Sequence, residues 1–131
     1  MGVKPSESST PWRARRGMNA ETMAARYLRR AGYVILGRNV RVGHLELDLV
    51  ARDGDAVVVV EVRARGRGAW VAPLATIDRT KRDRLRRAAT LLWRGRWSRW
   101  RWAQRVRFDV MSVYLDEADG PRILHVRAAF V

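Results

Sequence analysis

The chain has 131 residues, with 27 lysine and arginine residues against 13 aspartate and glutamate residues, and its formal net charge is +14. A charge of this size indicates a polyanionic partner, for which nucleic acid is the usual choice. The chain contains no cysteine, which excludes disulfides and thiolate metal sites. No apolar stretch is long enough to cross a membrane, and the N-terminal residues lack the apolar core of a secretory signal. We therefore expect a cytoplasmic protein without a membrane partner.

The N-terminal residues predict a tail followed by a single domain. Residues 1–17 show no hydrophobic periodicity and are rich in serine, proline and arginine, which predicts a flexible basic tail. Residues 18–131 are then expected to form one domain. Asn19 is expected to cap a helix that runs to about Arg30, and Gly32 is expected to end it.

The remaining elements alternate between strands and one further helix. Hydrophobic patterning and turn residues predict a strand over 33–40, a hairpin over 44–65, a helix over 78–93, and strands over 106–114 and 123–130. The resulting order is helix, three strands, helix, two strands, which predicts an α/β fold with a mixed sheet.

The hairpin turn sets which side chains share a face. Asp53-Gly54 is a strong signal for a two-residue turn, in which Arg52 pairs with Asp55. Side chains along a strand alternate between the two faces of the sheet. One face of the hairpin is therefore expected to be apolar and to carry Leu45, Leu47, Leu49, Ala51, Ala56, Val58, Val60 and Val62.

The opposite face gathers carboxylates. In this register Glu46 lies opposite Glu61, and Asp48 lies diagonal to Glu61. Like charges at this spacing repel one another, so the cluster needs a cation, a proton or a metal ion. Two explanations remain open: nearby arginines neutralise the carboxylates, or the carboxylates bind a divalent metal.

Basic residues crowd the second helix and the segment that follows it. Residues 94–103 interleave arginine with tryptophan, which suits stacking on bases and contact with phosphates. The pattern fits equally well with tryptophans that cap the sheet edge while arginines stack on them. The candidates for nucleic-acid contacts are Arg65, Arg84, Arg87, Arg96, Trp97, Arg99 and Trp100.

Several motifs occur in the order found in a known family. They are Ala20-Glu21, Gly32-Tyr33-Val34-Ile35-Leu36, Arg38-Asn39, Glu46-Leu47-Asp48-Leu49-Val50-Ala51, Val59-Val60-Glu61-Val62-Arg63-Ala64-Arg65 and Arg107-Phe108-Asp109-Val110. With them the chain resembles the YraN family, small bacterial proteins assigned to the restriction-endonuclease-like, PD-(D/E)XK nuclease superfamily. The matching pieces cover about residues 17–115. The resemblance implies a restriction-endonuclease-like core, with a central mixed sheet flanked by helices.

The resemblance also implies a role for each acidic residue. Asp48 matches the motif aspartate and Glu61 matches the acidic residue of the (D/E)XK element, so both are implied as ligands of Mg²⁺ or Mn²⁺. Glu46 matches a motif glutamate and is implied near the same metal. Glu21 matches the glutamate that some of these nucleases add from the first helix. The implied partner is nucleic acid, DNA more than RNA.

The chain departs from the family pattern at two positions. Leu45 replaces a glycine, and Arg63 stands where the superfamily places its catalytic lysine. That lysine helps to orient or activate water, whereas arginine keeps its proton and can only stabilise negative charge. Lys81 is a second candidate if its helix packs against the carboxylates; otherwise it is an ordinary surface lysine.

Three hypotheses about function follow. The first is a metal-dependent nuclease, and the second is a nuclease-fold module that binds nucleic acid without cleaving it, which Arg63 favours. The third is a basic scaffold for RNA or a protein partner. Asp109 is expected to be the structural partner of an arginine, and His44 is expected to be structural, although it could contact phosphate or metal.

Overall fold

The computed structural model describes residues 12–66, 77–115 and 121–131, with side chains from residue 20 onward. Its elements are α2 (Trp12–Arg30), β1 (Val34–Val42), β2 (Leu45–Asp53), β3 (Ala56–Arg65), α3 (Arg79–Gly95), the 3₁₀ turn η2 (Trp97–Arg99), β4 (Arg105–Tyr114) and β5 (Arg122–Phe130). This order of helices and strands confirms the predicted α/β fold.

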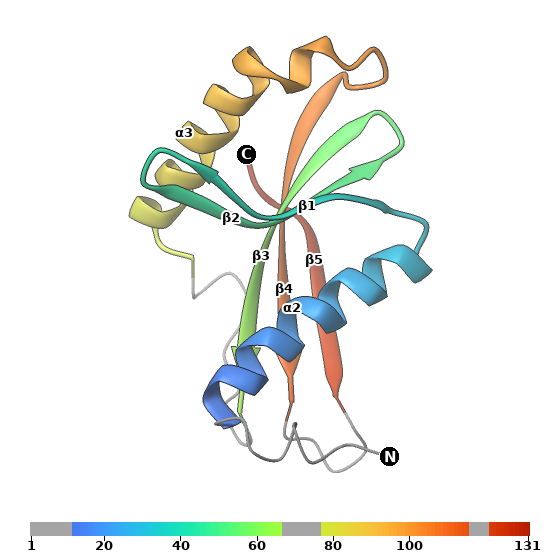
Figure 1. Ribbon diagram of the computed structural model, residues 1–131, viewed down its shortest axis with the longest axis vertical. Helices are drawn as coiled ribbons and strands as arrows, with labels where there is room; N and C mark the ends of the chain where they lie inside the picture. The colour runs from blue at the N-terminus through green and yellow to red at the C-terminus, as the bar shows by residue number, and fades with distance from the viewer. Residues whose placement is uncertain (1–11, 67–76, 116–120) are drawn as a thin grey trace.

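The strands form one five-stranded sheet in the order β1-β2-β3-β4-β5 (Figure 1). Neighbouring strands are antiparallel except β3 and β4, which run parallel. Parallel strands need a crossover connection, and α3 lies on the chain between β3 and β4. The mixed sheet is therefore a direct result of the helix placed after the hairpin.

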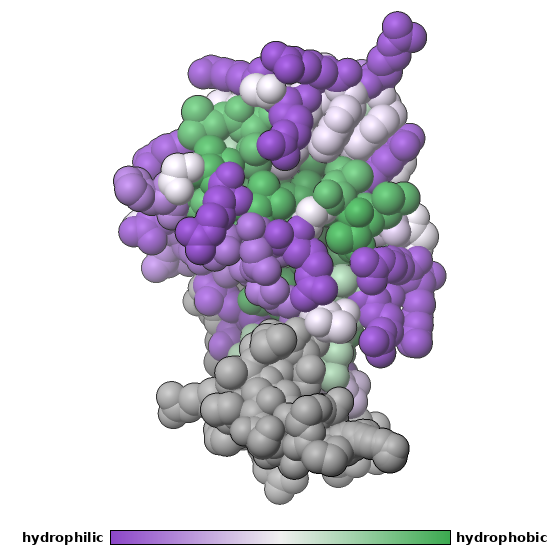
Figure 2. All heavy atoms as spheres, viewed as in Figure 1, coloured by the Kyte–Doolittle hydropathy of each residue, from purple (hydrophilic) through white to green (hydrophobic). Residues whose placement is uncertain are grey.

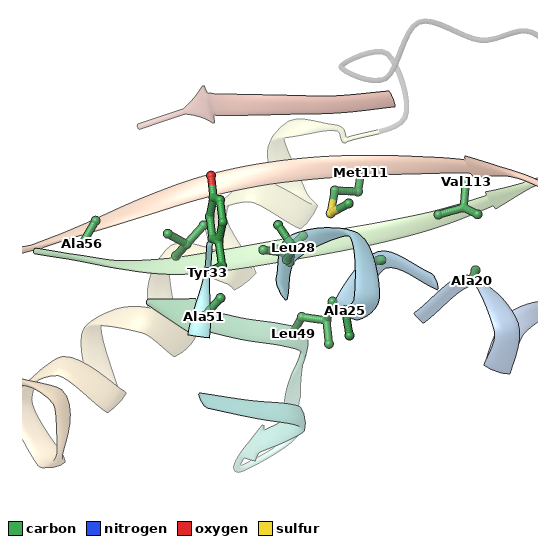
Figure 3. Packing of buried hydrophobic residues seen from close by; sticks show 12 residues of the cluster. Ala20, Ala25, Leu28, Tyr33, Leu49, Ala51, Ala56, Met111 and Val113 are labelled. Atoms are coloured by element: carbon green, nitrogen blue, oxygen red, sulfur yellow. The ribbon is translucent and has the colours of Figure 1, made fainter. Parts of the chain in front are cut away.

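Two apolar clusters show that the helices cover opposite faces of the sheet. Along β3, Val58 and Val60 pack with α2, whereas Val57 and Val59 pack with α3. Figure 3 shows the α2 side, where Leu28 lies among sheet residues and is fully buried. Full burial of each such side chain stabilises the fold by about 1.5–3 kcal/mol. A strand that is buried on both faces explains the unbroken valine run of β3.

Helix α3 starts at a capped residue and buries one stripe. The Asp78 side chain accepts a hydrogen bond of 2.8 Å from the Lys81 backbone N–H, so Asp78 is the N-cap. The buried residues of α3 recur at helical spacing and are Leu85, Ala88, Ala89 and Leu92. This cap stabilises the first turn of α3, which carries Lys81.

Helix α2 is longer than expected. It begins at Trp12, so Asn19 lies inside the helix and the predicted cap at Asn19 is wrong. Asparagine is favoured at N-caps but is also accommodated inside helices at a small cost, so it is a weak signal for the start of a helix. The predicted end is correct, because Gly32 adopts φ +96° directly after the last turn. Residues 1–11 of the expected tail lie outside the described residues, and the domain boundary stays a prediction.

The predicted hairpin register is wrong by two residues. Asp53 pairs with Ala56, so Gly54 and Asp55 form the turn, and Arg52 pairs with Val57. Gly54 adopts φ +61° at the first central position, which is the type II′ requirement. A shift of two residues keeps each side chain on its face. The part of the predicted apolar face near the turn is therefore correct, and it comprises Leu49, Ala51, Ala56, Val58 and Val60.

The alternation of faces breaks at Asp48. Leu49 packs on the α2 side as expected, but Leu45 and Leu47 pack on the α3 side, which corrects their predicted face. The ladder between β2 and β3 ends with the pair Leu49 and Val60. Beyond this point β2 pairs only with β1, and Glu46 lies next to Arg41 rather than opposite Glu61. The break is the point at which the site begins.

Candidate metal and nucleic-acid site

Asp48 joins the end of the hairpin ladder to the site. Its Oδ2 accepts a hydrogen bond of 2.9 Å from the backbone N–H of Val62 on β3. A half-buried N–H left without a partner would cost free energy, so the carboxylate takes the place of the missing strand contact. The interaction brings Asp48 beside Glu61, the residue that precedes Val62.

Glu61 is a buried carboxylate in ion-pair contact with two cations. Its side chain is 5% exposed, and its Oε2 lies 3.5 Å from Lys81 Nζ and 3.5 Å from Arg63 Nη2. Burial and the charge of Asp48 raise the pKa of Glu61 and the two cations lower it, so that together they raise the pKa to about 7. The cations therefore compensate only part of the cost of holding two acids together.

The structure brings Lys81 to the carboxylates. Helix α3 packs against β2, and the Nζ of Lys81 contacts Glu61 from the first turn of that helix. Lys81 was a candidate only if its helix packs against the carboxylates, and the structure meets this condition. Arg63 reaches the same oxygen from β3, so both predicted cationic residues meet at Glu61.

Glu21 approaches Asp48 from the other helix. Burial and the charge of Asp48 raise the pKa of Glu21, while Arg38 lies 3.8 Å from Glu21 Oε1. Arg38 also donates a hydrogen bond of 3.3 Å to the Thr22 hydroxyl. Asp48 thus stands near two further acids, Glu21 and Glu61, whose pKa values its charge raises in the same direction.

A hollow of about 230 Å³ lies between β2 and α3 beside these residues. Asp48 and Glu46 line it from β2, and Lys81 and Arg84 line it from α3. Glu46 is exposed, pairs with Arg41 on β1 and lies 3.9 Å from its Nε, so the predicted position opposite Glu61 is wrong. Its place near the metal stays a prediction.

The chemistry of the donors fits a magnesium ion with few protein ligands. Across the described ranges, no three histidine, cysteine, aspartate or glutamate side chains form a group that could hold a metal by themselves. Mg²⁺ is commonly held by one or two carboxylates, with water and phosphate as its other ligands. Asp48 and Glu61 meet this lower requirement, and a divalent cation would relieve the repulsion that raises the pKa of Glu61.

The arginine and tryptophan segment is largely self-contained. Trp97 is only 2% exposed and belongs to the core on the α3 side, so its ring does not fit the expected base-stacking role. Trp100 stacks between Trp97 and Trp102, at ring separations of 6.5 and 5.4 Å. Arg52 covers the ring of Trp102 at 4.4 Å. This arrangement matches tryptophans that cap the sheet while an arginine stacks on them.

The remaining predicted contact residues lie on two surfaces. Arg84 and Arg87 are exposed on α3, and Arg96 and Arg99 are exposed around η2. Arg65 is half-buried, and its Nε and Nη2 have no hydrogen-bond partner among the described residues. Figure 2 shows hydrophilic side chains over much of the face in view, which accords with the net charge of +14.

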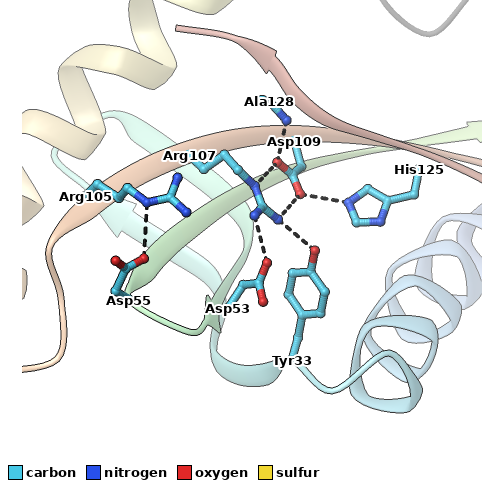
Figure 4. A network of polar contacts seen from close by, with 8 residues as sticks. All are labelled: Tyr33, Asp53, Asp55, Arg105, Arg107, Asp109, His125 and Ala128. Atoms are coloured by element: carbon cyan, nitrogen blue, oxygen red, sulfur yellow. Dashed lines mark hydrogen bonds and ion pairs between the residues drawn. The ribbon is translucent and has the colours of Figure 1, made fainter.

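Away from this site, the carboxylate of Asp109 lies in a network of hydrogen bonds and ion pairs (Figure 4). The buried Asp109 accepts hydrogen bonds of 2.9 Å from two guanidinium nitrogens of Arg107, and its Oδ2 lies 2.8 Å from His125 Nε2. Arg107 also contacts Asp53 and the Tyr33 hydroxyl, at 2.8 and 2.7 Å. The expectation that Asp109 partners an arginine is confirmed. The contact of His125 with Asp109 could not be predicted from the sequence, because the two residues lie on different strands.

A family comparison follows from the same stretch of chain. The model of the family described as Uncharacterised protein family UPF0102 matches residues 20–113, which include every acidic residue of the site as well as Arg63 and Lys81. The chain belongs to the UPF0102 family. YraN is another name for the same family, so the resemblance is confirmed.

Relatives from several bacteria match most of the chain. A UPF0102 protein of Sorangium cellulosum is 44% identical over 87% of this chain and 79% of its own length. Those of Nocardia farcinica and Pseudomonas aeruginosa are 42% and 44% identical, over 87% and 88% of this chain and 87% and 91% of their own lengths. Within the described ranges of this UPF0102 protein, no helix combines the length and apolar content that crossing a membrane requires.

Proposed function

We propose that this UPF0102 protein binds nucleic acid and hydrolyses phosphodiester bonds, with Mg²⁺ or Mn²⁺ at Asp48 and Glu61. The observation that carries the proposal is the contact of Lys81 with Glu61, at 3.5 Å from Nζ to Oε2. Lys81 on α3 would take the place of the lysine of the (D/E)XK element, where this chain has Arg63. Two acids and a lysine at one place are the groups that metal-assisted hydrolysis requires.

Each residue has a distinct task in this proposal. Asp48 and Glu61 would hold the metal, which supplies charge neutralisation at the phosphate and a more acidic water. Lys81 orients the attacking water through its ammonium group. Arg63 keeps its proton and stabilises negative charge that develops on the phosphate. Glu61 holds both cations in place through its Oε2.

The basic surface supplies the binding energy. The net charge of +14 favours a polyanion, and the exposed Arg84 and Arg87 extend from the acidic hollow along α3. Contacts between arginine and phosphate release counterions, so binding should weaken steeply as salt is raised. DNA is the proposed substrate ahead of RNA because the resemblance is to DNA-cleaving enzymes.

A non-catalytic binding module is the second candidate. The observation that favours it is that Arg63 and Lys81 both approach the same oxygen of Glu61, where they partly neutralise the acid without a metal. Such a module would bind DNA or RNA in a salt-sensitive way, without metal and without turnover. The two candidates differ in one property, which is metal-dependent cleavage.

The test is hydrolysis of single-stranded DNA, duplex DNA, branched DNA and RNA with Mg²⁺, Mn²⁺ or EDTA. Asp48→Asn, Glu61→Gln and Lys81→Met are each expected to lower the rate by at least about 100-fold. Arg79→Met, which removes one exposed charge from the same turn, is the matched control and should stay close to wild type. Lys81→Arg keeps the charge but replaces a compact ammonium with a planar guanidinium, so it should also lower the rate.

The outcomes separate the candidates. Cleavage that survives both Asp48→Asn and Glu61→Gln contradicts the site. Salt-sensitive binding without any metal-dependent product supports the binding module instead. Wild-type activity in Lys81→Met would mean that Arg63 serves without the lysine, which contradicts the role given to α3.

A further inference from the structure

A second hollow lies beside α3, with a lining unlike that of the acidic one. It measures about 330 Å³ and is bounded by α3 and β4. Ala89, Val106 and Phe108 make its apolar floor, and Trp93 stands at its side. Among the described residues, no acidic side chain lines it, whereas Arg86, Arg94 and the last residue, Val131, do. An apolar hollow with cationic edges fits a ligand that is both flat or apolar and anionic.

Trp93 differs from the other tryptophans that surround the sheet edge. Trp97, Trp100 and Trp102 stack on one another, and Arg52 covers the end of that column. Among the described residues, no ring stacks on Trp93, and its side chain is half-buried against the hollow. One part of the Trp93 indole packs against the core on the α3 side, and its exposed part offers a stacking surface beside the apolar floor.

The two arginines of the hollow are not equivalent. Arg86 is held by Asp83, at 2.8 Å, and by the main-chain oxygen of Val131. Arg94 is exposed, and no described carboxylate forms an ion pair with it. An anionic group of a ligand would therefore meet Arg94 while its apolar part enters the hollow.

We infer that this hollow receives one unpaired base of a bound nucleic-acid strand, which stacks on Trp93 while its phosphate contacts Arg94. The inference rests on the proposed function and adds its substrate class, a nucleic acid with unpaired nucleotides. A base inside a duplex is stacked on both sides, so it cannot offer a face to Trp93 unless it leaves the helix. Exposed arginines along α3 link this hollow with the acidic one, which favours a continuous strand over an acidic peptide.

The test compares binding to three probes by fluorescence anisotropy in EDTA: a single-stranded oligonucleotide, an abasic strand of equal length, and a blunt duplex. Trp93→Ala should weaken binding of the single strand by about tenfold, since stacking on one aromatic side chain is lost. Binding of the abasic strand and of the duplex should not change. Leu91→Ala, an exposed apolar residue of the same helix at 48% exposure, is the matched control.

Two further variants keep the test independent of folding. Trp93→Phe retains a ring and should recover most of the affinity for the single strand. Arg94→Gln should weaken the single strand and the abasic strand equally, because it removes a phosphate contact. Circular dichroism melts of each variant establish that the fold is retained.

Three results would overturn the inference. In the first, Trp93→Ala binds the single strand as tightly as wild type. In the second, its affinity for the abasic strand falls as much as its affinity for the single strand. An acidic peptide with a tryptophan could displace the strand from wild type but not from Trp93→Ala, which would assign the hollow to a protein partner. If wild type bound none of the three nucleic acids, the proposed function itself would fail, whereas the other results leave it standing.

Discussion

Asp109 and Glu61 are both buried carboxylates with arginine partners, yet their surroundings differ. Asp109 accepts hydrogen bonds of 2.9 Å from Arg107 and of 3.0 Å from the Ala128 N–H, while the cations near Glu61 stand at 3.5 Å. Burial alone would raise the pKa of Asp109, but the bonds from His125, Arg107 and Ala128 lower it below its ordinary value. Burial and the charge of Asp48 raise the pKa of Glu61 to about 7.

This difference indicates that Asp109 stabilises the fold, whereas Glu61 is a candidate for a functional role. A structural acid has its lone pairs occupied by donors at hydrogen-bond distance, so the charged form is stabilised. Glu61 has a neighbouring acid, and its two ion pairs at 3.5 Å offset only part of the cost of its charge, so a further positive group would stabilise it. Strongly perturbed acids of this second kind concentrate at functional sites, which is why Glu61 carries the functional assignment.

The largest expected effect is on stability at Asp109. Asp109→Asn leaves the buried Arg107 without its charge partner, and we expect the free energy of unfolding to fall by about 3–5 kcal/mol. Glu61→Gln should lower it much less, because the raised pKa of Glu61 means that its charge adds no stability at pH 7. Urea unfolding at pH 7 measures both. Equal losses at the two positions would abolish the distinction.

A smaller effect is expected at Asp48, where charge and hydrogen bonding can be separated. Asp48→Ala leaves the Val62 N–H without its acceptor and should lower the free energy of unfolding by about 1–3 kcal/mol. Asp48→Asn keeps an acceptor oxygen and should lose much less. Urea unfolding of the two variants side by side checks this, and an equally large loss in Asp48→Asn would show that the charge is structural.

The smallest effect concerns acid pH. Because the pKa of folded Asp109 is lowered, its contribution is present above the pKa of the unfolded chain and is lost as pH falls through the folded value. Wild type should therefore lose stability below about pH 4. The gap between wild type and Asp109→Asn should narrow over the same range, as measured by urea unfolding at several pH values. A gap that stays constant from pH 7 to pH 3 would contradict the lowered pKa.

Much of the fold is predictable because local patterns and global packing agree. The valine run of β3, the apolar stripe of α3 and the order of elements all indicate a mixed sheet covered by helices. The hairpin register was not predictable from Asp53-Gly54 alone, because glycine satisfies either of two turn positions and the two registers preserve the same faces. The predicted start of α2 was wrong because Asn19 was interpreted as an N-cap, whereas the helix already begins at Trp12.

The candidate site was predictable in its residues but not in its geometry. Asp48 and Glu61 follow from the motif, whereas the break in alternation at Asp48 depends on where β2 leaves β3. Lys81 lies far from Glu61 in the sequence, and only the packing of α3 brings the two together. Trp93 had no signal of its own, because the neighbouring Trp97 and Trp100 made the later segment look like the stacking surface.

The central claim is that Asp48 and Glu61 together hold a divalent metal ion. A crystal soaked in Mn²⁺ and measured for anomalous scattering tests it most directly. We expect a peak between the two carboxylates, about 2.1 Å from an oxygen of each, and its loss in Glu61→Gln. The absence of a peak at that position, in crystals of wild type that bind Mn²⁺ elsewhere or not at all, would contradict it.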